Sequence, residues 1–275
     1  MRGHRLTAIR SMPVLSVLLT ALLCAAAAGL VGAKADTGSS ASFDTAIERY
    51  RVLLVADVDR SVTSVEKLRD SVASGDLATA RQAWIEARVG WERAEVFTSG
   101  FAPELDRDID AWPNGPTGFH AIEVTLFGAG HTNVSSEVDA LLRNLTEMAA
   151  KARQTRLSPQ GLLDGLSRLA YEVGESKLDG GESRVSGTSL DDIRHNVEGI
   201  EQAYDTIFAA AIESRDPKLC GTVRHQIDEL KSMLAPSDLR QIDQDRLRLA
   251  SEDLVVMFQT AAPEIALARP TLELQ

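Results

Sequence analysis

Cysteine, aromatic side chains and turn-forming residues are all scarce in this chain of 275 residues. It has two cysteines, too few for a scaffold held together by disulfide bonds. Aromatic residues make up 5% of the chain, and glycine and proline together number 28, which excludes collagen-like and low-complexity sequences. The fold must therefore be stabilised by burial of aliphatic side chains, either in one large domain or in two smaller ones.

An excess of positive charge is also absent. The chain has 29 Lys and Arg against 40 Asp and Glu, a formal net charge of −11. A protein that binds nucleic acid needs clustered cations to neutralise phosphates, so we expect no nucleic-acid partner. The acidity leaves open what the carboxylates do.

The first 35 residues have the pattern of a secretory signal peptide. Arg2, Arg5 and Arg10 precede an apolar run over residues 12–31, and an Ala-x-Ala sequence ends at Ala35. This pattern predicts cleavage after Ala35 and a periplasmic or extracellular protein. Cleavage would remove four cations and no anion, which leaves a net charge of −15.

Two alternatives to cleavage after Ala35 remain open. Cys24 could carry a lipid anchor, but Leu23 stands where a lipoprotein signal prefers a small residue, so we expect membrane association only if Cys24 is lipidated. An uncleaved anchor would also be long enough to span a bilayer, although the Ala-x-Ala sequence favours cleavage. The mature chain keeps Cys220, which is expected to be a buried thiol.

Apolar residues recur every three or four positions through most of the mature chain, the period of amphipathic α-helices. The longest stripe, Phe43 to Val72, predicts one helix of about 30 residues. Gly75 ends it, and Asp76 is a candidate N-cap for a second helix extending through Ala94. The remaining helices are predicted from about Thr117 to before Gly128, and over residues 134–152, 159–175, 190–213, 219–234 and 239–267.

Residues 98–116 are predicted to form a loop, because they contain two glycines and three prolines. No run of convincing length alternates as a β-strand does. The sequence therefore predicts an all-α fold of two packed antiparallel helical bundles. We expect one domain over residues 36–275, with bundle halves at about 43–155 and 156–270.

Two pairs of residues have the spacing of side chains on one helix face. Glu92 and Glu95 lie three apart and can reach a common point, although with Arg88 nearby they could equally form a solvated face. His120 and Glu123 have the same spacing, which suits metal ligation but also suits a hydrogen-bonded core histidine. An acidic run over residues 106–110 lies between the pairs and could be a solvated loop.

Taken in order, these motifs resemble the imelysin-like family, and within it the EfeO/EfeM periplasmic iron-uptake proteins. The resemblance is carried by the run from Ala87 to Glu95, by Leu105-Asp106 and Ile109-Asp110, and by the run from Thr117 to Glu123. It continues through Gly181 to Arg184, Leu190 to Asp192 and Asn196 to Gly199. It covers nearly all of the mature chain.

The resemblance implies an all-α protein of two helical bundles with a metal site in a cleft. Carried onto this sequence, the candidate ligands are Glu92, Glu95, Asp110, His120, Glu123 and Glu182. Asp110 is preferred to Asp108 because the match passes through Ile109-Asp110. A set of mostly oxygen donors with one imidazole suits iron, with zinc, manganese or calcium as other possibilities.

The implied function is capture of iron and its delivery to a membrane permease, with that permease and a haem peroxidase as partners. Only residues 36–42 precede the first predicted helix, so we expect the short form without the copper-binding cupredoxin domain. A zinc metallopeptidase is the first alternative, but Val124 stands where a His-x-x-Glu-His motif needs its second histidine, so we favour a binding protein over an enzyme. Binding of an anionic polysaccharide through a metal bridge is the second.

This sequence departs from the family pattern in three places, one of which is Ala121, where a basic residue is frequent. Residues 186–189 read Ser-Gly-Thr-Ser where the family often has Ser-His-Thr-Asp, so a second metal site that used this histidine or aspartate would be lost. Trp91 stands where a tyrosine is usual. The tryptophan is expected to alter the surroundings of the main site more than its ligands.

Overall fold

The computed structural model describes residues 37–110, 117–175, 177–178 and 182–272, and every regular element in these residues is helical. The all-α fold class is therefore confirmed. The predicted signal peptide and Cys24 lie outside the described residues. The elements are α1 (Thr37–Ser74), α2 (Leu77–Phe101), α3 (Pro103–Ile109), α4 (Gly118–Glu123), the π-helical turn η1 (Val124–Ala129), α5 (Ser135–Gln154), α6 (Pro159–Gly174), α7 (Ser189–Ala203), the π-helical turn η2 (Tyr204–Phe208), α8 (Ala209–Glu213), α9 (Pro217–Met233), the 3-10 turn η3 (Leu239–Gln241) and α10 (Gln244–Glu264).

Helix α1 is one uninterrupted helix of 38 residues, and its predicted apolar stripe is buried except for the half-buried Val62. Gly75 reverses the chain after it with φ of +75°, a conformation that favours glycine. The carboxylate of Asp76 then accepts a hydrogen bond from the backbone N–H of Thr79 at 3.1 Å, so the predicted N-cap of α2 is confirmed. The two long helices therefore form an antiparallel hairpin.

The prediction of a loop over residues 98–116 is wrong for most of its described part. Helix α2 continues to Phe101, and α3 begins two residues later with Pro103 in its first turn. Proline is tolerated there because a backbone N–H in the first turn of a helix has no acceptor within the helix. Leu105 and Ile109, four residues apart, are buried and attach α3 to the core. Pro103, one of the three prolines on which the loop prediction rests, is therefore the first residue of a helix. Residues 111–116 lie outside the described part.

The other predicted helices are confirmed, with corrections at their ends. The predicted helix over 190–213 is interrupted by the π-helical turn η2, and the one over 239–267 begins with the separate 3-10 turn η3 before α10 starts at Gln244. A π-helical turn, η1, also follows α4 directly after Glu123. Such turns insert one extra residue into a helical stretch, which a periodicity of 3.6 does not reveal.

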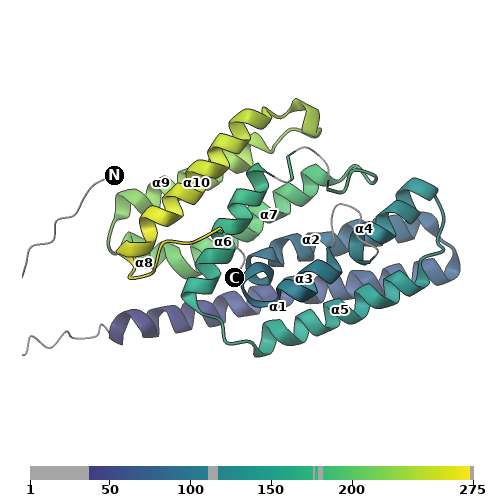
Figure 1. Ribbon diagram of the computed structural model, residues 1–275, viewed down its shortest axis with the longest axis horizontal. Helices are drawn as coiled ribbons and strands as arrows, with labels where there is room; N and C mark the ends of the chain where they lie inside the picture. The colour runs from purple at the N-terminus through teal and green to yellow at the C-terminus, as the bar shows by residue number, and fades with distance from the viewer. Residues whose placement is uncertain (1–36, 111–116, 176, 179–181, 273–275) are drawn as a thin grey trace, which may run out of the picture. The chain divides into compact units, whose positions relative to one another are not determined.

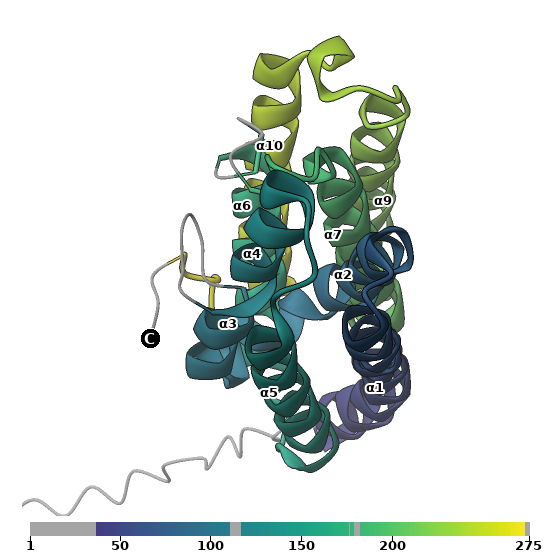
Figure 2. The ribbon, with the colours of Figure 1, turned by 90° about the vertical axis from the view of Figure 1, so that its right-hand side faces the viewer.

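Helix α2 lies at the centre of the fold and packs against α1, α6 and α7. Figure 1 shows α1 and α5 along one side and α9 and α10 along the other, with α6 and α7 between them. The view in Figure 2 agrees with this order. Since α2 packs against helices from both halves of the chain, the boundary of the bundle halves near residue 155 stays a prediction.

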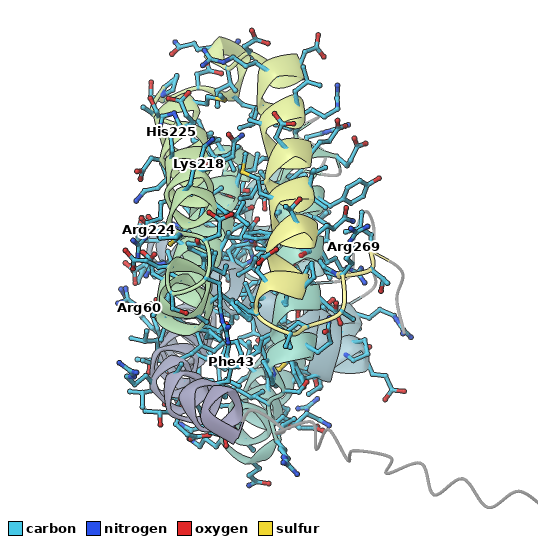
Figure 3. The ribbon with its side chains drawn as sticks, turned by 90° about the vertical axis from the view of Figure 1, so that its left-hand side faces the viewer. Phe43, Arg60, Lys218, Arg224, His225 and Arg269 are labelled. Carbon is cyan, nitrogen blue, oxygen red and sulfur yellow. The ribbon has the colours of Figure 1, made fainter. Side chains whose placement is uncertain are left out.

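Charged side chains cover the outer face of α9. Lys218, Arg224 and His225 are exposed there and point away from the bundle (Figure 3). Alternating with them, Cys220 and Val223 are buried, so Cys220 is a core residue as expected. Among the described residues, no helix has the length and apolar character needed to cross a membrane.

Candidate metal centre

The predicted ligands come from four parts of the chain that meet beside α2. Glu92 and Glu95 lie on α2, Asp110 follows the last residue of α3, His120 and Glu123 lie on α4, and Glu182 lies in the segment between α6 and α7. Further polar residues join the cluster. They include Arg88 from α2, Lys177 from between α6 and α7, and Asp192 and Asn196 from α7.

Glu92 and Glu95 point into the protein. Glu92 is fully buried, and the side chain of Glu95 is 11% exposed. The amide of Asn196 donates hydrogen bonds to Oε2 of Glu92 at 2.9 Å and to Oε2 of Glu95 at 2.5 Å. The alternative of a solvated helix face is therefore wrong for this pair.

Asp110 accepts a hydrogen bond from an α2 side chain at each of its two carboxylate oxygens. Its Oδ1 accepts a hydrogen bond from Nη1 of Arg88 at 2.7 Å, and its Oδ2 accepts one from the indole N–H of Trp91 at 2.9 Å. Asp108, the neighbour that was not preferred, is exposed. The tryptophan that departs from the family pattern therefore contacts a candidate ligand directly.

His120 is 4% exposed and is oriented by Glu123. Its Nδ1 lies 3.1 Å from Oε2 of Glu123, whose Oε1 accepts hydrogen bonds at 2.7 Å from both the backbone N–H and the hydroxyl of Ser186. A carboxylate that fixes one ring nitrogen leaves the other to face a metal ion, which it can bind once the ring has lost its proton. That other nitrogen, Nε2, lies 3.1 Å from Oδ1 of Asp110 and has no aligned hydrogen-bond partner among the described residues.

Two groups of three have the proximity that a single metal ion requires. One ligand atom each from Asp110, His120 and Glu182 lie within 4.8 Å of one another, and so do atoms from Glu92, Glu95 and Asp110. The groups share Asp110, and Glu123 contacts the histidine of the first. The structure thus brings all six predicted residues together, and their role as metal ligands stays a prediction.

Two buried cations lie among these carboxylates, and neither is among the site residues predicted from the sequence. Arg88 is 1% exposed and pairs with Glu92 and Asp110. Lys177 is 3% exposed, and its ammonium lies 3.0 Å from Glu92. The spacing of four between Arg88 and Glu92 was a usable signal, but Lys177 lies outside any helix and no local pattern marks it.

Burial disfavours the ionised form of every carboxylate in the cluster, and neighbouring charges decide the outcome. Against burial, Arg88 lowers the pKa of Glu92 and, together with His120, holds the pKa of Asp110 well below its usual range. Burial and the charge of Glu92 raise the pKa of Glu95 well above its usual range, and burial raises the pKa of Glu182 to about 7. The raised pKa values of Glu95 and Glu182 show that carboxylates are crowded in this buried cluster, and a bound cation would relieve that crowding.

The pKa of His120 follows from the same balance. Burial disfavours the imidazolium, but the charge of Asp110 and the hydrogen bond to Glu123 raise the pKa from its ordinary 6.5 to about 9. The charged ring therefore contributes its whole stabilisation of the folded state below pH 6.5, and this contribution is lost as the pH rises through about 9.

We predict that NMR titration of the metal-free protein places the pKa of His120 near 9. The free energy of unfolding should decline between pH 6.5 and 9 more steeply in the wild type than in a His120→Gln variant. A measured pKa at or below the ordinary 6.5 would contradict the arrangement described for Asp110 and Glu123.

The donor set fits a hard or borderline metal ion. Five carboxylates and one imidazole converge, no thiolate takes part among the described residues, and the buried Nε2 of His120 lacks an aligned partner. Oxygen donors with imidazole suit iron, manganese, calcium and zinc, and do not favour soft metals. The fold and the site together define an all-α protein with a buried cluster of acidic residues and histidine.

Comparison with known proteins gives the family. The model of the family described as "Peptidase_M75: Imelysin" matches residues 46–117 and 114–257, most of the described chain. The chain belongs to the imelysin family, and the resemblance drawn from its motifs is confirmed.

Curated relatives match over most of their length. An "Efem/EfeO family lipoprotein" of Staphylococcus aureus (strain MRSA252) is 29% identical over 214 residues, covering 72% of this chain and 73% of the relative. A protein of the same description from Staphylococcus haemolyticus is 28% identical, covering 71% of each. The "Iron uptake system component EfeM" of Pseudomonas syringae pv. syringae is 26% identical over 245 residues, covering 86% of this chain and 81% of the relative.

Proposed function

We propose that this protein captures iron outside the cytoplasmic membrane and delivers it to a membrane permease. The observation that carries the proposal is the buried convergence of Glu92, Glu95, Asp110, His120 and Glu182, with one imidazole nitrogen lacking an aligned hydrogen bond. The similarity to a protein named as a component of an iron uptake system supports iron as the cargo.

The residues divide by role in this proposal. Asp110, His120 and Glu182 would bind the ion directly, because their ligand atoms are close together and include both nitrogen and oxygen. Glu123 would hold the ring of His120 in place through Nδ1. Glu92 and Glu95 would supply further oxygen donors next to Asp110.

Export and the transport partners also belong to the proposal. Two relatives are named lipoproteins, which supports a protein that leaves the cytoplasm. Since residues 1–35 lie outside the described part, both cleavage after Ala35 and lipidation of Cys24 stay predictions. The permease and the haem peroxidase are proposed partners because the family resemblance implies an Efe-like uptake system.

Calorimetric titration of the purified mature protein with iron tests the proposal. We expect wild-type binding at micromolar concentrations or tighter, and a loss of at least about a hundredfold when His120 and Glu123 are both replaced by alanine, because both the ligand and the group that orients it are removed. The replacement pair His225→Ala and Asp228→Ala is a matched control, since it has the same spacing but lies on exposed helix surface.

Three outcomes would contradict the proposed function or its assigned site. Absence of iron binding by the wild-type protein at micromolar concentrations would remove its basis. Cleavage of casein that disappears in a Glu123→Gln variant would instead make the metallopeptidase alternative the better assignment. Equal loss of binding in the control pair would show that the assay reports general acidity and not this site.

A further inference from the structure

Lys177 is a buried ammonium, and its ion-pair partners among the described residues are all candidate metal ligands. Its Nζ lies 3.0 Å from Oε2 of Glu92, 3.0 Å from Oε2 of Glu95 and 3.2 Å from Oε2 of Glu182. Within the described residues these are its only ion-pair partners. A lysine is almost never fully buried unless it is paired, so the three carboxylates keep this charge in the interior.

Arg88, the other buried cation, is held differently. Its Nε donates to Asp192 at 3.1 Å, a carboxylate outside the predicted ligand set. Its guanidinium also lies over the rings of Trp84 and Phe119, at 5.5 and 5.3 Å from their centroids. Among the residues that the structure describes, Arg88 therefore keeps partners whether or not the candidate ligands bind a metal, and Lys177 does not.

The chemistry of the two side chains supports the same distinction. Arginine is a rigid planar fork, here fixed by two aromatic rings, whereas lysine carries a compact charge on a flexible four-carbon stem. Arg88 also lies within α2, while Lys177 lies in the segment between α6 and α7. Of the two cations, Lys177 is the one that can leave the cluster without unpacking a helix.

We propose that the Lys177 ammonium is an internal competitor for the metal: it pairs with Glu92, Glu95 and Glu182 in the metal-free protein and moves away from them when the ion binds. This inference rests on the proposed function. Two cations at the same oxygens repel each other, so binding must break the lysine's ion pairs or accept that repulsion. On release of the ion, the ammonium returns and neutralises the carboxylates. The lysine thus weakens binding and favours release, which suits a protein that passes its cargo on.

The test compares the metal affinity of wild type, Lys177→Met and Lys177→Arg by anaerobic titration of Fe²⁺ into the metal-free proteins. Lys177→Met keeps the length of the side chain but removes its charge, so we expect about tenfold tighter binding and slower release. Lys177→Arg keeps the charge and should not bind more tightly than wild type. Lys231→Met removes a lysine that pairs with Glu201 on the surface, and should leave the affinity unchanged.

Thermal unfolding gives a second readout that does not depend on calorimetry. Without metal, Lys177→Met should melt below wild type, because three carboxylates lose their counterion. With saturating Fe²⁺ it should gain more in melting temperature than wild type does, because tighter binding stabilises the folded state more. If Lys177→Met does not fold, Lys177→Gln provides the same test with a neutral polar side chain.

The outcomes separate this inference from the proposed function. Iron binding by the wild type, with equal or weaker binding by the folded Lys177→Met or Lys177→Gln variant, overturns the competitor role and leaves the proposed function intact. Absence of binding by the wild type and by every variant overturns both. A gain in affinity in Lys231→Met as large as that in Lys177→Met also overturns the inference, because loss of any positive charge would then suffice.

Discussion

Replacing Arg88 with methionine is expected to lower the free energy of unfolding of the metal-free protein by about 3–5 kcal/mol, because it leaves buried carboxylates without their counterion. Arg88 pairs with Glu92, Asp110 and Asp192, all of which have almost fully buried side chains. Burial already raises the pKa of Asp192 to about 6 against the lowering effect of Arg88. Without the guanidinium these groups must take up protons or draw in water.

Urea-induced unfolding at neutral pH measures this effect. Arg153→Met is the control, since Arg153 forms an exposed ion pair with Asp59 and its removal should cost less than about 1 kcal/mol. An Arg88→Met variant as stable as this control would mean that the charge balance described for the centre is wrong.

Replacing Gly118 with alanine is expected to lower the free energy of unfolding by about 3 kcal/mol, through a strained backbone and an overpacked contact. Gly118 begins α4 with φ of +74°, a conformation that L side chains rarely adopt. A Cβ at this position would also lie 2.1 Å from the carbonyl oxygen of Ile109. Since Asp110 follows Ile109 and His120 lies two residues after Gly118, any shift that relieves the contact moves two candidate ligands apart.

Gly75→Ala is the matched control for Gly118→Ala. Gly75 has nearly the same φ of +75°, but a Cβ there would meet no atom within 4 Å. The free energy of unfolding of Gly75→Ala should therefore fall by only about 1–2 kcal/mol, the cost of placing alanine in the left-handed conformation. Chemical denaturation compares the two variants, and iron titration should show weakened binding in Gly118→Ala alone. Equal losses of stability would contradict the close packing of α4 on α3.

The helices were predictable because their signal is local. The stripe from Phe43 to Val72 and the cap at Asp76 each depend on residues within a few turns of one another. The wrong loop prediction over residues 98–116 has a local cause too. Proline disrupts the interior of a helix but suits its first turn, where Pro103 lies. The π-helical turns were missed because they change the period instead of ending the helix.

The candidate site was predictable as a set of residues, but its charge balance was not. Glu92 with Glu95, and His120 with Glu123, stand out by spacing, and the family resemblance added Asp110 and Glu182. Spacing cannot reveal which distant cation enters such a cluster. Lys177 is 85 positions from Glu92, and only the tertiary fold brings its ammonium within 3.0 Å of that carboxylate.

The ligand set draws on both ends of a long stretch of chain, from Glu92 on α2 to Glu182 beyond α6. An ion bound by both Glu92 and Glu182 would be a removable cross-link between two residues about ninety positions apart in the chain. Opening of the helices around it would then require loss of the ion, so the loaded protein should resist proteases better than the empty one. Susceptibility to cleavage would in this way report whether an ion is bound.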